Sequence, residues 1–69
     1  MKKRMFECVN GVSNKFWEVW VDDGGLYTRY GKIGTDGQVS CVPYTDDDEA
    51  NKAAEKIIKS KIKKGYVEV

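Results

Sequence analysis

The segment from Arg29 to Gln38 carries the side chains best suited to binding a ligand. It reads Arg-Tyr-Gly-Lys-Ile-Gly-Thr-Asp-Gly-Gln, so one aromatic ring stands between two cations and glycine recurs at every third position. Glycine has no Cβ, and a backbone that contains it can approach a ligand closely. A Tyr30 ring next to the Lys32 ammonium group suits the face of a sugar and its phosphate. These residue types point to recognition of a sugar–phosphate group by Tyr30, Gly31 and Lys32.

The glycines of this segment have a simpler interpretation as turn residues. A P-loop needs Ser or Thr after Gly-Lys and a helix that starts there. Here Gly31-Lys32 is followed by Ile33 and by a further turn sequence. Hairpin and bulge geometry therefore accounts for Gly31, Gly34 and Gly37 without a bound phosphate.

The composition does not favour catalysis or metal binding. The chain has no histidine, and its two cysteines, Cys8 and Cys41, stand thirty-three residues apart. These facts exclude the common zinc spacings and every catalytic scheme that uses imidazole. The acidic run 46–49 lacks the alternating ligands and the glycine of a calcium loop. We therefore expect no enzyme activity, no cofactor and no metal.

Hydropathy and cysteine usage bear on the compartment. No apolar run reaches the ~18 residues that span a bilayer, and no apolar stretch follows the basic N-terminus as it would in a signal peptide. We expect two buried, reduced thiols at Cys8 and Cys41, with a disulfide between them as the alternative. The prediction is a cytoplasmic protein that does not enter a membrane.

Alternation of apolar and polar residues predicts four strands separated by turns. Asn10-Gly11 and the runs 22–25 and 35–38 supply the turn sequences. The expected strands cover residues 5–9, 15–21, 26–33 and 38–44, and a short closing strand covers 66–69. Because Val69 lies inside this last strand, the sequence is compatible with a longer chain.

The period of the pattern changes after the fourth strand. Thr45 or Asp46 is placed to cap a helix that ends at Gly65, with acids in its first turn and lysines in its last. Its apolar stripe can cover one face of a sheet. The stripe consists of Ala50, Ala53, Ala54, Ile57, Ile58 and Ile62. We predict one α+β domain over residues 1–69, an antiparallel meander of four to five strands with one C-terminal helix packed on one face.

Strand alternation also assigns side chains to faces. Tyr30 and Lys32 share one face of the third strand, whereas Arg29 projects from the other, where we expect it to pair with an acid or support the helix side. On the second strand, Trp17 lies on the apolar face and is predicted to be in the core. Two aromatic residues point the opposite way and form a candidate protein-contact patch. They are Phe16 and Trp20.

The net charge of +1 predicts no polyanion partner by itself, but the cations gather in the first twenty and last nineteen residues. The helix face with Lys52, Lys56, Lys59 and Lys63 is typical of a solvated surface. Near the end of the sequence, Tyr66 would bring nearby lysines beside Tyr30 if the closing strand pairs with the sheet. These lysines are Lys61, Lys63 and Lys64. To the candidate site we add Lys63, Lys64 and Tyr66, and also Arg29.

Four stretches resemble the signature of the WGR domain, a family named for a Trp-Gly-Arg triplet and known from poly(ADP-ribose) polymerases and small bacterial proteins. The run 14–17 reads Asn-Lys-Phe-Trp, similar to the family's Asn-Lys-Phe-Tyr. Arg-Tyr-Gly-Lys-Ile-Gly at 29–34 occupies the place of Arg-Trp-Gly-Arg-Val-Gly, and Gly37-Gln38 the place of Gly-Gln. The helix 50–64 and the following Gly-Tyr resemble the family's helix and closing aromatic.

In the polymerases, WGR domains grip DNA ends, and the tryptophan of the triplet lies against the terminal nucleotide. The resemblance therefore implies a non-catalytic module that binds DNA at an end or break, with Tyr30 on sugar or base and Lys32 on phosphate. Tyrosine offers less stacking area than tryptophan, and lysine lacks the bidentate fork of arginine, so we expect weak, salt-sensitive binding. The alternative is a protein-interaction module that uses an exposed aromatic face or a sheet edge.

Overall fold

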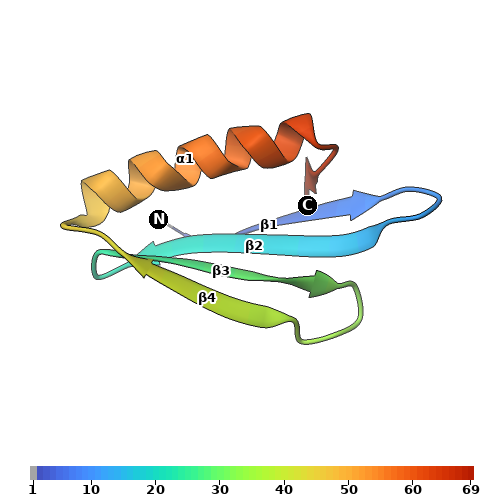
Figure 1. Cartoon of the computed structure of the whole chain (residues 1–69), viewed down its shortest axis with the longest axis horizontal. Helices are drawn as coiled ribbons and strands as arrows, with labels where there is room; N and C mark the ends of the chain where they lie inside the picture. Colours follow the sequence, from blue (N-terminus) through green and yellow to red (C-terminus); the bar gives the residue numbers. More distant parts are fainter. Residues whose placement is uncertain (1) are drawn as a thin grey trace.

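Alternating residues and tight turns produce four strands in succession, followed by a helix and a short fifth strand (Figure 1). The computed structural model describes residues 2–69. The strands are β1 (Arg4–Val9), β2 (Asn14–Asp22), β3 (Gly25–Lys32), β4 (Gln38–Pro43) and β5 (Val67–Glu68), and the helix is α1 (Asp47–Lys63). The predicted α+β class is confirmed, and so is the antiparallel meander with one C-terminal helix.

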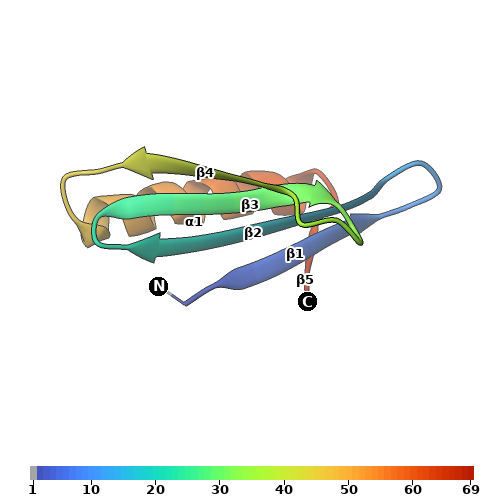
Figure 2. The same ribbon diagram turned by 90° about the horizontal axis from the view of Figure 1, so that it is seen from below.

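The five strands form one antiparallel sheet in the order β4-β3-β2-β1-β5. β5 closes the sheet at the outer edge of β1, where Phe6 lies opposite Glu68. Figure 1 shows α1 lying along one face of the sheet, and Figure 2 shows the opposite face without a covering element. In the described part of the chain, no helix is long and apolar enough to cross a membrane.

The turn between β2 and β3 holds the start of the helix in place. Asp23 and Gly24 both have positive φ, 49° and 76°, and Asp22 pairs with Gly25 to close the hairpin. Positive φ at both central residues is the geometry of a type I′ turn, which matches the twist of the flanking strands. The Gly24 N–H donates to Asp47 Oδ1 over 2.6 Å. The turn and the first turn of α1 therefore share one end of the molecule.

Both ends of α1 are capped by the predicted residues. Asp46 is the N-cap, and its side chain accepts a hydrogen bond from the Glu49 N–H over 2.9 Å. At the other end, Gly65 has a φ of +101°, the Gly65 N–H donates to Ile62 O and the Tyr66 N–H donates to Lys61 O. These two bonds form a Schellman motif, which satisfies the last carbonyls of the helix and turns the chain towards β5.

The core lies between α1 and the covered face of the sheet. Phe6, Val19, Ala50 and Ala54 are fully buried, and Trp17 is 3% exposed, as predicted. The other core residues are Val21, Leu26 and Ile58. Small alanines on the helix let its backbone approach the sheet closely, so that the large strand residues fill the space on either side.

Two predictions about burial are wrong, and both concern the uncovered face. Phe16 was expected in an exposed patch but is only 5% exposed, because the Arg29 guanidinium lies over its ring at 4.7 Å from the ring centre. Cys8 and Cys41 are both free thiols, but Cys41 is exposed rather than buried. It lies on β4, an edge strand whose residues are all exposed.

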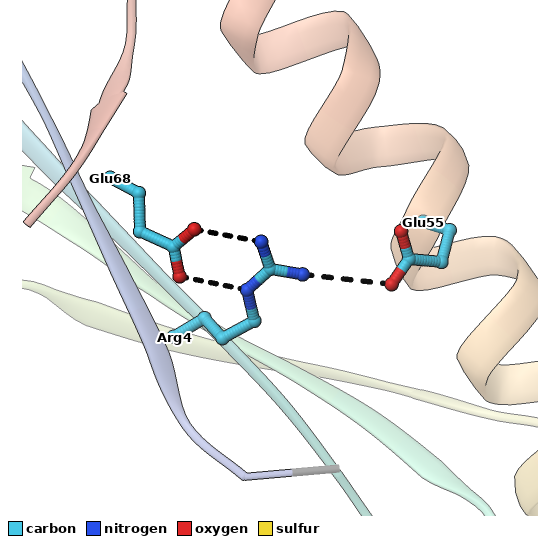
Figure 3. A network of polar contacts seen from close by, with 3 residues as sticks. All are labelled: Arg4, Glu55 and Glu68. Atoms are coloured by element: carbon cyan, nitrogen blue, oxygen red, sulfur yellow. Dashed lines mark hydrogen bonds and ion pairs between the residues drawn. The ribbon is translucent and has the colours of Figure 1, made fainter.

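One ion-pair network ties β1 to both β5 and α1 (Figure 3). Arg4 binds Glu68 through two parallel hydrogen bonds, Nε to Oε2 and Nη2 to Oε1, each 2.8 Å long. Its third nitrogen, Nη1, lies 3.6 Å from Glu55 Oε1. The hydrogen bond to Glu68 raises the pKa of Arg4, and the same bond lowers the pKa of Glu68.

Candidate functional site

Two adjoining hollows lie on the sheet, and the first of them lies beside the C-terminal half of α1. The first, here called the helix-side hollow, has a volume of about 440 Å³ and lies between the helix and strands β2 and β3. It is lined by Lys15, Phe16, Trp17, Thr28, Tyr30, Gly31, Ile57, Lys61 and Tyr66. The second, the turn-side hollow, has a volume of about 510 Å³ and is lined by Val12, Ser13, Asn14, Lys15, Gly31 and Lys32. Lys15 and Gly31 line both, so the two hollows adjoin at these residues.

Strand register positions the Tyr30 ring at the helix-side hollow. Tyr30 lies directly opposite Trp17 on the face that carries α1. Trp17 is buried, whereas Tyr30 is 43% exposed. The rigid core residue therefore supports an aromatic ring that stays open to solvent, which is the arrangement needed to pack against a ligand.

The glycines at this end of the sheet are explained by close packing of the β3–β4 turn. A Cβ on Gly31 would lie 2.9 Å from the Gly37 Cα, and one on Gly37 would lie 2.6 Å from the Tyr30 carbonyl oxygen. Gly37 also has a φ of +73°, which L side chains rarely adopt. The interpretation of these residues as turn glycines is confirmed.

The lysines around the hollows are brought together without acidic neighbours in the lining. Lys15 lies directly opposite Lys32 across β2 and β3. Lys61 reaches in from the helix, and its Nζ lies 5.5 Å from the Trp17 ring centre and 5.2 Å from that of Tyr66. Of the described residues that line the two hollows, none is Asp or Glu. An anion placed here would meet several cations and no fixed negative charge.

The environment of Lys61 shows how unfavourable this arrangement is without a counterion. Burial lowers the pKa of Lys61, and the positive charges of Lys64 and Lys15 lower it further. A bound phosphate would oppose these effects, because it places a negative charge beside the ammonium group. Lys61 is therefore suited to bind an anion.

The structure brings together some of the predicted site residues and separates others. Tyr30, Gly31 and Tyr66 line the helix-side hollow, and Lys32 lines the turn-side hollow. Lys63 and Lys64 are exposed and line neither one. Of the three lysines near the end of the sequence, only Lys61 lines a hollow, and it was not assigned to the site.

Lys15 was missed by the sequence analysis, although the sequence held a signal for it. The Asp22–Gly25 turn fixes the register of β2 against β3. Counting back from that closing pair in equal steps places Lys15 opposite Lys32. The Tyr30 face would then have included Lys15.

Arg29 lies outside the two hollows. Its Nε donates to Glu18 Oε1 over 2.9 Å, and its Nη1 donates to the Asp36 carbonyl oxygen over 2.8 Å. The predicted pairing with an acid is confirmed, but support of the helix side is wrong, because α1 covers the opposite face. Arg29 holds the β3–β4 turn against β2.

The uncovered face carries a second aromatic cluster. The Trp20 and Tyr27 rings stack with centres 5.4 Å apart and planes within 4°, and Lys3 Nζ lies 4.6 Å from the Trp20 ring centre. Trp20 is half-buried in this stack. Trp20 and Phe16 therefore do not form one open patch, since the Phe16 ring is covered.

Comparison with known proteins places these features in a family. The family model described as WGR domain matches residues 2–69. The uncharacterized protein YfeS of Escherichia coli K12 is 41% identical over 70 residues, which covers 99% of this chain and 28% of that protein. Protein YehF of the same organism is 43% identical over 65 residues, 94% of this chain and 24% of that protein.

A solved structure agrees with the fold. A crystal structure of a Bacteroides fragilis protein matches with a TM-score of 0.96 and 44% sequence identity, covering 99% of this chain and 19% of that one. The chain thus spans about a quarter of the length of the curated relatives it matches. Since the family model matches residues 2–69, the chain belongs to the WGR domain family.

Proposed function

We propose that this domain is a non-catalytic module that binds DNA at an end or break through the two hollows. The observation that carries the proposal is the convergence of Lys15, Lys32 and Lys61 around the exposed Tyr30 ring, with no carboxylate in the described lining. Phosphates contact the lysines, and the tyrosine packs on a sugar or base. Membership of the WGR family also supports DNA binding.

The proposed interface is small, and its affinity depends on salt. Three lysines correspond to about 2–4 neutralised phosphates, so the slope of log K against log salt is about −2 to −4. Lysine makes no bidentate contact to phosphate, which keeps each contact weak. Binding is therefore measured best at low ionic strength.

A second candidate function is protein binding by the uncovered face. It is supported by the Trp20–Tyr27 stack and by β4, an exposed edge strand without a charged side chain. Edges of this kind accept an added strand from another chain. If this is the function, Trp20→Ala weakens capture of the protein partner and leaves DNA affinity unchanged.

The DNA proposal is tested by fluorescence anisotropy at low salt with three labelled DNAs. These are a blunt duplex with 5′ phosphates, the same duplex closed by hairpins at both ends, and a single strand. Tighter binding to the open duplex than to the closed one supports recognition of an end. Equal, weak binding to all three DNAs means that the interaction is a non-specific attraction between charges. Absence of binding overturns the proposal.

A further inference from the structure

We propose that the helix-side hollow takes one unpaired nucleotide at the end of a DNA strand, so that the domain prefers ends with a single-stranded overhang to blunt ends. The inference rests on the proposed function and specifies which kind of DNA end is bound.

The hollow is a half-open concavity between the helix and the sheet. Its volume of about 440 Å³ lies within the range of about 300–1,000 Å³ that is usual for small-molecule sites. A base inside a duplex is stacked on its neighbours and paired along one edge, so it cannot enter a space between a helix and a sheet. An unpaired base at a strand end enters at little cost, because less stacking and no pairing is lost.

The lining suits a base better than it suits a phosphate alone. Ile57 of α1 and Tyr66, just before β5, supply apolar and aromatic surface, and both are half-buried. The exposed Tyr30 ring lies on the same lining, and the buried Trp17 forms the floor beneath it. Nucleic-acid bases stack on aromatic side chains whatever their sequence, since every base has a π-face. Thr28 adds a hydroxyl group to the same lining.

The charges lie where the backbone of such a nucleotide would pass. Lys61 and Lys15 both line the hollow, and Lys15 continues into the turn-side hollow with Lys32. A strand that leaves the helix-side hollow therefore meets further cations in the adjoining hollow. The absence of Asp and Glu from the described lining favours this anionic ligand over a neutral or cationic one.

Trp17 provides a direct reporter of occupancy. The chain has two tryptophans, and Trp20 lies on the opposite face of the sheet. In a Trp20→Phe background, Trp17 is the single tryptophan, and its fluorescence responds to a base stacked in the hollow. The probes are one hairpin-closed duplex stem with a blunt end, a three-nucleotide 3′ overhang or a three-nucleotide 5′ overhang.

The inference expects one overhang probe to bind at least about tenfold more tightly than the blunt probe, with a saturable change in Trp17 fluorescence. Thr28→Phe, which places a large side chain in the hollow, should remove this preference, so that the overhang probes bind no more tightly than the blunt probe. Ser40→Phe is the matched control, because Ser40 lies opposite Thr28 on β4 but outside the hollow. Should Thr28→Phe fail to fold, Lys61→Met tests the preference for an overhang, because it removes the charge of Lys61 and keeps a long apolar side chain at that position.

The outcomes separate the two proposals. Equal affinity for all three probes with unchanged Trp17 fluorescence overturns the overhang inference and leaves DNA binding intact. An overhang preference that survives Thr28→Phe also overturns it. Failure of all three probes to bind overturns the proposed function as well.

Discussion

Lys15 and Lys32 lie directly opposite each other on β2 and β3, with both side chains on the face that carries α1. Like charges that face each other across a strand pair destabilise the sheet. The same geometry becomes favourable when an anion lies between the two ammonium groups. The pair therefore links a cost in the free protein to a gain when an anion binds.

Lys32→Glu should abolish DNA binding and leave the melting temperature unchanged or slightly higher. The substitution replaces a like-charge pair by an opposite-charge pair, which is worth about 0.2–1 kcal/mol of stability. Anisotropy and thermal unfolding of the same preparation measure both effects. Lys52→Glu makes the same charge change on the exposed face of α1 and should keep most of the affinity. A large fall in stability would instead mark Lys32 as a structural residue.

Lys61→Met should weaken DNA binding without destabilising the free domain. The substitution keeps a long apolar side chain against the Trp17 and Tyr66 rings and removes a charge that burial and two neighbouring lysines disfavour. Loss of one phosphate contact should reduce the steepness of the salt dependence by about 1 unit. Folding stability that fell together with binding would contradict an anion-binding role.

The pH dependence of stability gives Lys61 a second signature. Because its pKa is lowered on folding from 10.5, the unfolded chain holds more protons between the folded and unfolded values, and the stability contribution of Lys61 rises with pH there. Lys61→Met lacks this rise, so the stability difference between the two proteins should change across the alkaline window. Urea unfolding at several pH values measures it. Tyr27, whose pKa is raised, is common to the two proteins and cancels in the comparison.

Gly37→Ala should destabilise the domain by about 1–3 kcal/mol and weaken DNA binding at the same time. The new Cβ would meet the Tyr30 carbonyl oxygen and the Phe16 ring, in a backbone conformation that already disfavours L residues. Gly34→Ala shares the positive φ but has open space around its Cβ, and should cost less. Gly11→Ala has neither problem and should be nearly neutral. Equal effects for all three would refute the packing argument.

Arg29→Met should lower stability by about 1–3 kcal/mol while the affinity for DNA changes little. It removes hydrogen bonds to Glu18 and to the Asp36 carbonyl, and it uncovers the Phe16 ring. Chemical denaturation and anisotropy, compared with Glu18→Gln, measure the two properties. A strong loss of affinity in a protein that remains folded would show that Arg29 takes part in DNA binding.

Glu68→Gln should reduce stability at neutral pH but not at strongly acidic pH. The hydrogen bonds from Arg4 lower the pKa of Glu68 below 4.5, so the carboxylate stabilises the fold above that value and loses its effect as the pH falls through the lowered pKa. We expect the difference in melting temperature between the original protein and Glu68→Gln to become smaller as the pH is lowered. Arg4→Met should remove the same pH dependence. A difference that is constant with pH would disprove the charge-based account.

Local sequence signals were enough to predict most of the fold. Strand alternation identified the buried face with Phe6, Trp17 and Val19, because a half-covered sheet needs a period of two. Asp46 and Gly65 marked the helix ends because their side-chain and backbone chemistry acts within a few residues. These effects do not depend on the rest of the molecule.

The errors arose where distant parts of the chain meet. Burial of Phe16 depends on the Arg29 guanidinium, and exposure of Cys41 follows from its place on an edge strand, beside Tyr27 on the face that no element covers. Recruitment of Lys61 rather than Lys63 or Lys64 depends on the rotation of α1 over the sheet. Only the three-dimensional arrangement sets these relationships, so residue types alone could not predict them.

The pairing of β5 with β1 has a consequence for the order in which the molecule assembles. The first four strands form by successive hairpins between sequence neighbours, which close quickly. Phe6 and Glu68, in contrast, come from opposite ends of the sequence, and β5 contributes only two residues to the ladder. We expect β5 to join late in folding and to open first in the native state. In hydrogen exchange, the amide of Val69, bonded to the Met5 carbonyl, should therefore exchange far sooner than those of β2.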